Sequence, residues 1–437
     1  MDMDASPPMG LALRKPRFTE RFGFLSALLN PADSMNATLR AFAAAFVITA
    51  AQLLLAVVCL APEGPLSYRY STLVQHDSYW FENIIDRGYQ TTVPPINHKM
   101  MEVSNTAFFP AYPAIATAVQ YALRIGTSNA LLVTAQAAAF GFWVYFFLFC
   151  DRWRLPFSMT AFGAAAIASH PAAFFLITGY SESLFLMSLL GFLYWSSATC
   201  KRAKVWAALH GICMSATRIV GIPCAGAPVV QAVMARGWAG VRDVRGWFRR
   251  YSPSVALTAV ACLGAGGFFV FCLLRWGRWD MYMLTQQAGW GIEPDYFALL
   301  KPSSYRWLVP TLYNPTEASQ MAMTLGGLML LAVIACEFVF RARVDWHTRV
   351  ALYFMAFVIY FISVAGVASV AMESMLRYEF CVHALIVLAF LQFLSQLPTP
   401  PRLVRALGMA AVVVFGAAGI VVQGWYVWNF TRGNWVA

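Results

Sequence analysis

Charged side chains are scarce in this 437-residue sequence. They make up 12% of the residues, whereas 60% are hydrophobic and 15% are aromatic. Soluble globular domains carry roughly 25% charged residues. The composition therefore excludes an ordinary soluble domain and predicts a membrane protein.

Paired cysteines and compact metal-binding motifs are also missing. The nine cysteines lie in or at the ends of apolar runs, and none forms a CxxC pair. This arrangement indicates small core residues rather than a disulfide framework or a metal site. Because no DxD motif in the two long loops and no His/Cys cluster asks for a metal, we expect no required cofactor; a divalent cation at Asp77 stays open.

Long uncharged runs, by contrast, recur along the whole chain. Each is long enough to cross a hydrocarbon core of ~30 Å as a helix. The runs are Ala41–Leu60, Val103–Leu123, Ile125–Cys150, Tyr251–Leu274, Ala318–Cys336, Val350–Met372 and Ala406–Thr431. We expect an all-α, polytopic transmembrane bundle of about eleven spans, forming a single domain over residues 39–437.

The basic residues gather in short connectors. With a formal net charge of +11, the chain places many of its arginines in the N-terminal segment 1–38 and in 236–250 and 341–349. Segments 62–107 and 276–318 instead balance acidic and basic residues. The positive-inside rule puts segment 1–38 in the cytoplasm, without a cleavable signal peptide, and the two long loops outside, with interfacial helices in them. Basic connectors of this kind do not indicate nucleic-acid binding.

Strict alternation of spans conflicts with this rule at two places. It puts Asp151–Arg154 and Lys201–Lys204 outside, although both segments are basic. Short helices that enter the membrane and turn back at His170-Pro171 and near Arg218 would remove part of the conflict. The topology between residues 155 and 235 therefore stays open.

Chemistry-bearing residues gather in one stretch outside the apolar runs, Gln75–Tyr89. Its apolar residues fall at helical spacing on one face, and Gly88 is placed to end the helix. The apolar face consists of Trp80, Phe81, Ile84 and Ile85. Such a helix can lie along a membrane surface and hold Asp77 near the interface. Asp77 is then either the catalytic carboxylate of a membrane enzyme or merely the cap of the helix.

Ionisable residues also interrupt apolar sequence further along. Glu182 lies in Tyr180–Ser183, and Thr217-Arg218 divides another apolar segment. A charge at membrane depth costs a few kcal/mol, so such residues face a cavity or a partner. Glu182 and Arg218 either belong to a site or form a pair that only joins helices. Arg377, at the start of a later span, is either a ligand contact or an arginine that reaches toward the interface.

Taken together, these motifs resemble the PIG-V family of GPI mannosyltransferases and its bacterial relatives, multi-span enzymes of the GT-C glycosyltransferase class. The first-loop pattern W-D-S-x-W-Y-x-x-I-A-x-x-G-Y corresponds to residues 76–89, with His76 in place of Trp and Ile85 in place of Ala. The other matches are A-F-F-P-L-Y-P at Ala107–Pro113, N-P…Y-S-E-S-L-F at His170-Pro171 and Tyr180–Phe185, A-T-R-x-x-G at Ala216–Gly221, and looser motifs at Gln287/Trp290-Gly291 and Ser374–Tyr378. The resemblance extends from about residue 40 to 400.

The resemblance implies an inverting transferase that uses a polyprenyl (dolichyl-type) phosphate sugar, with mannose expected, on the non-cytoplasmic side of the membrane. In a bacterium that membrane is the inner membrane, and a GPI acceptor is then excluded. The acceptor is a glycan, a lipid or a protein, and membrane lipid is a further partner. An acceptor hydroxyl must lose a proton as it attacks, and Asp77 is the candidate general base.

The departing lipid phosphate needs a cation in a low-dielectric site, and arginine's planar fork suits phosphate. Arg218 and Arg377 are therefore the candidate donor-phosphate ligands. The candidate substrate-binding residues are His76, Tyr79, Glu102, Asn105, Tyr180, Glu182, Gln287 and Tyr378.

A transporter or lipid flippase is the alternative from another class. It would equally explain multiple spans, broken helices and the intramembrane Glu182 and Arg218. However, the two halves of the chain show no obvious internal repeat, and the polar residues cluster at outside loops rather than at matching midplane positions. A purely structural scaffold would not need buried arginines. The pattern favours the enzyme.

Overall fold

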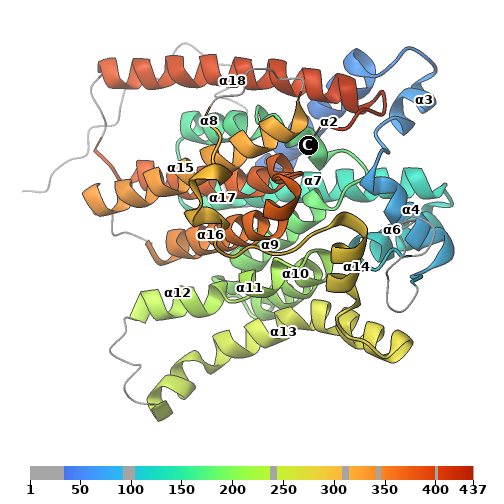
Figure 1. The fold of residues 1–437 in the computed structure, drawn as a ribbon. Helices are drawn as coiled ribbons and strands as arrows, with labels where there is room; N and C mark the ends of the chain where they lie inside the picture. The colour runs from blue at the N-terminus through green and yellow to red at the C-terminus, as the bar shows by residue number, and fades with distance from the viewer. Residues whose placement is uncertain are drawn as a thin grey trace, which may run out of the picture.

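Helices form all of the regular structure in the described part of the chain (Figure 1). The computed structural model describes residues 34–91, 104–236, 244–307, 314–340, 346–398 and 402–436. Seven of its helices are long and apolar enough to cross a membrane. They are α2 (Ser34–Leu54, continued by η1, Leu55–Leu60), α7 (Thr127–Arg152), α13 (Val244–Trp276), α15 (Pro315–Phe340), α16 (Trp346–Val367), α17 (Met375–Ser395) and α18 (Arg402–Phe430). The chain is a polytopic helical membrane protein, as predicted.

Four shorter helices also carry the chain between the two ends of this bundle. They are α8 (Phe157–Ala168), α9 (Glu182–Ser196), α10 (Ala203–Thr217) and α12 (Ala227–Arg236). Arg218 after α10 pairs with Glu182 at the start of α9, whereas Arg152 at the end of α7 donates to the carbonyl of Tyr194 near the end of α9. Lys204 at the start of α10 also donates to the carbonyl of Ser196 at the end of α9, so α9 and α10 run in opposite directions. The described residues thus contain eleven passes, four of them made by helices of 10–15 residues, so the number of membrane spans stays a prediction.

One of the predicted boundaries is wrong. The run Val103–Leu123 does not form one helix, because α6 covers only Ala111–Leu123 and the residues before it form turns. Pro110 and Pro113 fit the entrance of α6 but not the middle of a longer helix. The span predicted to begin at Arg377 is present as α17, which holds Arg377 in its first turn.

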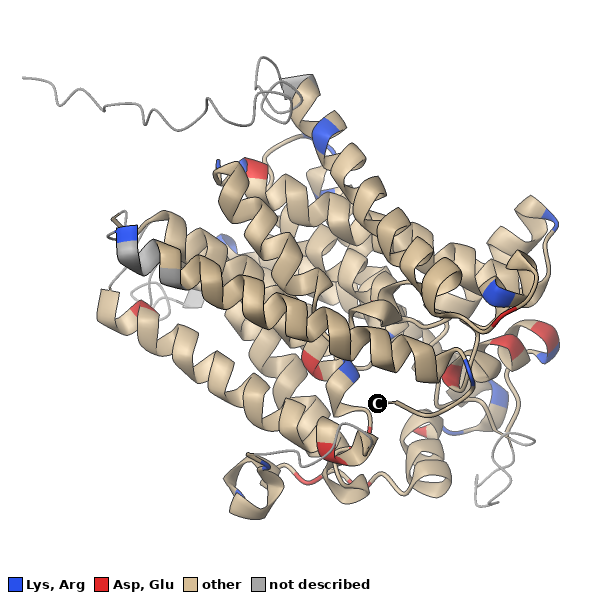
Figure 2. Ribbon diagram, turned by 90° about the horizontal axis from the view of Figure 1, so that it is seen from above, with Lys and Arg blue, Asp and Glu red and all other residues tan. Residues whose placement is uncertain are grey.

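The shorter α6 removes the topological conflict found in the sequence. Arg40 on α2 lies 3.6 Å from Asp151 at the end of α7, so the basic segment 151–154 is at the same end of the bundle as the start of α2. Lys204 donates to the carbonyl of Ser196, which lies at that end too. Acidic residues gather instead at the end that holds α4 and α6, and the middles of the helices carry few charges (Figure 2).

Helix α4 (Asp77–Arg87) follows the predicted pattern closely. Gly88 ends it with a φ of 73°, a conformation that favours glycine. The predicted apolar face does not lie open to a membrane surface: the ring of Phe81 packs edge-on against Phe108 and Tyr112, at the base of α6. On the other face, Asp86 accepts a hydrogen bond from Thr127 at the start of α7. Helix α4 is therefore fixed on both faces by the bundle.

The remaining short elements connect these helices at the end that holds α4. They are α3 (Leu66–Ser71), η2 (Ala173–Leu176), α11 (Gly221–Cys224), α14 (Met281–Trp290), η4 (Ala298–Leu300), η5 (Pro302–Ser304) and η6 (Ala368–Val370). Figure 1 shows α4, α6 and α14 at one end of the bundle, and the C-terminal segment turning back after α18.

Candidate active site

Four charged side chains from distant parts of the sequence meet at this end. Nη1 of Arg377 lies 2.6 Å from Oδ2 of Asp77 and 3.7 Å from Oε1 of Glu182. Nη1 of Arg218 lies 2.9 Å from the same Oε1 of Glu182. The side chains of Arg377 and Glu182 are 6% and 2% exposed, so these two are buried, whereas Arg218 and Asp77 are partly exposed at 16% and 23%. We call these four residues the charge cluster.

The ends of four helices bring the cluster together. Asp77 is the first residue of α4 and Glu182 the first residue of α9, while Arg218 directly follows α10. Carboxylates are favourable at the positive N-terminal end of a helix, and cations at the C-terminal end. Arg377 breaks this rule, because it lies in the first turn of α17, and its two carboxylate neighbours offset the cost.

The capping interpretation of Asp77 is wrong. His76 occupies the cap position of α4, and no side-chain hydrogen bond caps this helix. The carboxylate of Asp77 reaches Arg377 instead, 300 residues away. Its backbone N–H lies 3.4 Å from the hydroxyl of Tyr180, which accepts from it. Asp77 therefore belongs to the charge cluster rather than to its own helix end.

Backbone strain concentrates around the charge cluster. His76 has a φ of 50°, and Ala371, Met372 and Ser374, in the turn before α17, have φ values of 54°, 63° and 67°. Positive φ in residues other than glycine costs roughly 1–3 kcal/mol each and persists only where surrounding contacts enforce it. Here the enforced turns direct Asp77 and Arg377 toward each other.

A cavity of about 730 Å³ opens beside the charge cluster. Besides the four charged residues, its wall contains three of the predicted substrate-binding residues, Tyr180, Tyr378 and Gln287. The ring of Tyr378 lies 4.9 Å from the guanidinium carbon of Arg218. Apolar side chains such as Ile359 and Ile362 line the part of the cavity formed by α16. We call this space the large cavity; its wall combines charged and apolar surfaces.

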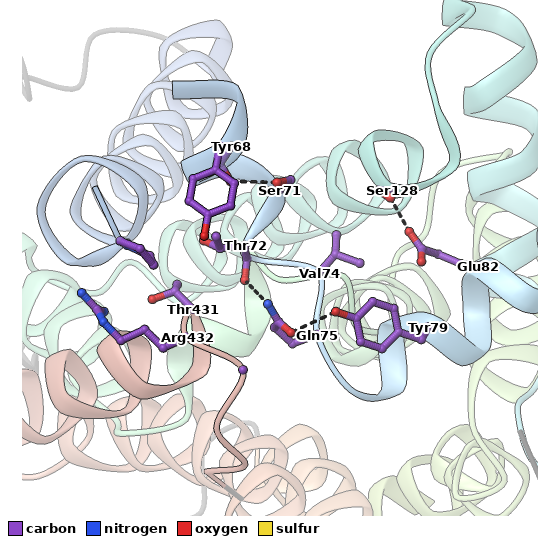
Figure 3. Close-up of a pocket in the computed structure, with 12 residues that line it drawn as sticks. Tyr68, Ser71, Thr72, Val74, Gln75, Tyr79, Glu82, Ser128, Thr431 and Arg432 are labelled. Carbon is purple, nitrogen blue, oxygen red and sulfur yellow. Dashed lines mark hydrogen bonds between the residues drawn. The ribbon is translucent and has the colours of Figure 1, made fainter. Parts of the chain in front are cut away.

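A second space, the polar groove, lies on the other side of α4 (Figure 3). It measures about 570 Å³. Gln75 lies in its wall between two neighbours, donating to the carbonyl of Thr72 and accepting from the hydroxyl of Tyr79. Glu82 accepts from Ser128 at the edge of the groove. Tyr79, predicted to bind substrate, thus faces the groove and not the large cavity.

Two other predicted substrate-binding residues, Asn105 and His76, lie outside both spaces. Asn105 is 1% exposed and is used to hold the end of α4, donating to Asn83 and to the carbonyl of Gly88. His76 packs its ring against Trp435, and its Nε2 has no hydrogen-bond partner among the described residues. Glu102 lies outside the described residues.

Sequence reasoning missed several residues that line or support the site. Tyr282 and Glu293, from the second long loop, line the large cavity, and Glu293 accepts from Gln287 at 3.4 Å. Burial raises the pKa of Tyr282, so its hydroxyl stays protonated and can donate to a ligand. Ser374 accepts from Nη2 of Arg377 at 3.0 Å. No charge run or motif marks Tyr282 or Glu293, and only their position in that loop pointed to them.

One group of side chains has the donor types of a metal site, which the sequence did not show. Ligand atoms of His170, Glu379 and His383 lie within 4.8 Å of one another. Nδ1 of His170 accepts from the backbone N–H of Ala172, so the ring proton of a neutral His170 is on Nε2 and is donated to Glu379 at 2.7 Å. Nε2 of His383 donates to the carbonyl of Ala166. These hydrogen bonds join α17 to the end of α8 and to His170, which follows it.

No protein-family model and no curated protein matches the sequence. Among solved structures, the chain is similar to the archaeal oligosaccharyltransferase AglB from Archaeoglobus fulgidus, in complex with an inhibitory peptide and a dolichol-phosphate, at 12% identity and a TM-score of 0.47. That match covers 90% of this chain and 56% of the length of AglB. The chain is also similar to ArnT from Cupriavidus metallidurans in the apo state, at 15% identity and a TM-score of 0.47, covering 89% of this chain and 75% of ArnT.

Proposed function

We propose that this protein is a membrane-embedded, inverting glycosyltransferase of the GT-C class. It transfers a sugar, in our proposal mannose, from a polyprenyl-phosphate donor to an acceptor hydroxyl. The observation that carries the proposal is the charge cluster at the wall of the large cavity. Two carboxylates and two arginines are expensive to bury at a helix bundle's end, and a pair that merely joins helices would not need an open cavity beside it.

Asp77 acts as the general base in this proposal. Its side chain is 23% exposed and lines the large cavity, so an acceptor hydroxyl can come within hydrogen-bond reach of it. The hydroxyl proton passes to the carboxylate as the acceptor oxygen forms its bond to the anomeric carbon of the sugar. The bond from that carbon to the phosphate oxygen breaks on the opposite face, which inverts the anomeric configuration.

The two arginines serve the departing phosphate in different ways. Arg218 has 16% of its side chain exposed and lines the large cavity, so its guanidinium can turn from Glu182 to a phosphate oxygen. Arg377 is more completely engaged, with Asp77 and Ser374 as hydrogen-bond partners. It contributes a fixed positive charge, which stabilises the charge that develops on the leaving group.

Two buried atoms of the cluster support a ligand at this place. Oε2 of Glu182 and Nε of Arg377 are buried and have no hydrogen-bond partner among the described residues. A buried carboxylate oxygen without a partner costs about 1–3 kcal/mol or more. A sugar hydroxyl donating to Glu182 would satisfy its free oxygen, and the apolar wall of α16 suits the hydrocarbon chain of a polyprenyl donor.

The remaining parts of the proposal rest on the sequence. The charge asymmetry of the loops places segment 1–38 in the cytoplasm and the charge cluster on the periplasmic or luminal side. The acceptor is a glycan, a lipid or a protein. We propose that no cofactor is required, and transfer measured with and without a chelator tests whether a divalent cation takes part.

The proposed function is tested by incubating the purified protein with a panel of polyprenyl-phosphate sugars and following the release of polyprenyl phosphate. A glycosyltransferase releases it from one donor far faster than from the others, and faster still when the acceptor is added. A lipid flippase would instead move a labelled donor across a proteoliposome membrane without releasing polyprenyl phosphate, and that result would overturn the proposal.

A further inference from the structure

Four aromatic rings surround the guanidinium group of Arg377. Its guanidinium carbon lies 5.6 Å from the ring centroid of Phe175, 5.1 Å from that of Tyr180, 5.7 Å from that of Tyr378 and 5.6 Å from that of Trp435. A cation enclosed by aromatic faces is attracted to each of them, more strongly where water is excluded. Three of these rings come from elements of the bundle, and Trp435 comes from the segment after α18.

Specific contacts fix this segment, residues 431–436, in place. The chain turns back after Phe430 at Gly433, which has a φ of 82° and donates its N–H to the carbonyl of Phe430 at 2.9 Å. Arg432 donates to the carbonyl of Leu60 at 3.1 Å, which ties the segment to the end of η1. Val436 is 4% exposed. The return of the chain is therefore a packed part of the structure that delivers Trp435 to Arg377.

Trp435 touches both neighbours of the catalytic candidate Asp77. On one side it lies against Arg377, the ion-pair partner of Asp77. On the other side its ring meets the ring of His76, the preceding residue in the chain, edge-on at 5.1 Å. The segment that carries it also lines the polar groove through Thr431 and Gly433. Trp435 thus lies behind the pair of Asp77 and Arg377, away from the large cavity.

Hydrogen bonds alone do not fix the guanidinium plane of Arg377. Nη1 is shared between Asp77 and Glu182, at 2.6 Å and 3.7 Å, and Nη2 meets Ser374, while Nε has no partner among the described residues. A rotation of the group would lengthen the short contact with Asp77. Flat rings packed around a guanidinium restrict such a rotation.

We propose that Trp435 is a positioning residue of this enzyme: it holds the guanidinium of Arg377 in the orientation that directs it at Asp77 and at the donor phosphate. The inference rests on the proposed function. Trp435 lines neither the large cavity nor the polar groove, so in this proposal it does not contact the substrate. It acts through Arg377, so its loss affects turnover rather than donor binding.

The test uses the full-length enzyme and the donor selected from the panel. Trp435→Leu keeps an apolar side chain but removes the ring, and should lower kcat about 10- to 30-fold, the range expected for a desolvated cation–π contact. The KM for the donor should stay within about threefold, and Trp435→Phe should restore most of the turnover because it returns an aromatic face. Trp206→Ala is the matched control, since Trp206 is 46% exposed on α10 far from Arg218 and should change neither value.

A double-mutant cycle separates positioning from a merely structural role. If Trp435 acts through Arg377, then Trp435→Leu should cost little further turnover once Arg377→Lys is present. Fully additive losses, or a Trp435→Leu variant with more than a third of the wild-type kcat, would overturn the inference. If wild-type protein transfers no sugar from any donor, the proposed function fails. In that case the wild type, Trp435→Leu, Arg377→Lys and the double variant can be titrated with polyprenyl phosphate in thermal-shift measurements. Non-additive losses of the thermal shift then show that the two residues act together, and additive losses show that they do not.

Discussion

Replacing Asp77 with Asn separates catalysis from structure at the centre of the site. The substitution is nearly isosteric, and the amide oxygen can still accept from Nη1 of Arg377, which lies 2.6 Å from Oδ2 in the wild type. An amide cannot accept a proton from the acceptor hydroxyl. Removing a general base typically costs on the order of 10²–10⁴-fold in rate. We therefore expect sugar transfer to fall by that factor while the donor still binds.

The structure also sets the expected loss of stability. The charge cluster holds two carboxylates and two guanidinium groups, so Asp77→Asn leaves one positive charge in excess. Breaking a buried pair outright costs about 3–5 kcal/mol. Here the hydrogen bond survives with a neutral acceptor, at roughly half its strength, and the Asp77 side chain is 23% exposed to the cavity. We expect a loss of about 1–2 kcal/mol of unfolding free energy, seen as a melting temperature lowered by a few degrees.

The assay follows release of polyprenyl phosphate at saturating donor, beside thermal unfolding in the same detergent. Asp86→Asn is the matched control, because Asp86 lies on the same helix and is exposed. Among the described residues, its side chain has a hydrogen bond with Thr127 alone. It should keep wild-type turnover. If Asp77→Asn transfers sugar at more than about a tenth of the wild-type rate, the base is another group and the reasoning is refuted.

Three further predictions concern the phosphate ligand, the packing behind α4 and the orientation of the chain. Arg218→Lys keeps the positive charge but loses the planar fork of the guanidinium group. The value of kcat/KM for the donor should fall about 10- to 100-fold with little change in melting temperature. Unchanged kinetics would remove Arg218 from the site. A Cβ on Gly179 would lie 2.7 Å from Oγ of Ser78, so Gly179→Ala should displace the start of α4 and lower turnover on the order of tenfold or more, and full activity would show that this turn tolerates movement. Two variants with a single cysteine each test the orientation: one has Gln90→Cys, and the other keeps the exposed native Cys200 at the opposite end. The first should react with an impermeant thiol reagent in intact cells, and the second only after permeabilisation. The reverse pattern would invert the predicted topology.

The residues of the charge cluster could be predicted from the sequence because most of them are exceptions to the rule that apolar segments carry no charge. Glu182, Arg218 and Arg377 are ionisable residues in or beside apolar sequence, where each needs a partner or a cavity. Asp77 was identified differently, by its place at the start of the amphipathic stretch Gln75–Tyr89. That argument identifies the residues but not their pairing. The sequence suggested a bond between Glu182 and Arg218, which the structure contains, but gave no sign that Asp77 meets Arg377 across 300 residues.

Other features were beyond the reach of pattern reasoning for definite physical reasons. Helix α6 was overestimated because hydropathy does not register the two prolines and the turn before it. Trp435 carries no sequence signal at all, since its importance comes from the turn at Gly433 that returns the chain to Arg377.

The balance of charge in the cluster accounts for the order of events in the proposed reaction. Two carboxylates and two guanidinium groups cancel, so the empty cluster is neutral and can be buried. A phosphodiester donor brings one negative charge, and Arg218, the more exposed of the two arginines, is the group able to turn toward it. When the sugar leaves, the lipid phosphate becomes a monoester with about −1.5 to −2 charges, while Asp77 has become neutral by taking the acceptor's proton. The negative charge thus moves from Asp77 to the phosphate, and Arg377, held between them, stays paired throughout. Loss of the proton from Asp77 restores the original pair and weakens the hold on the product.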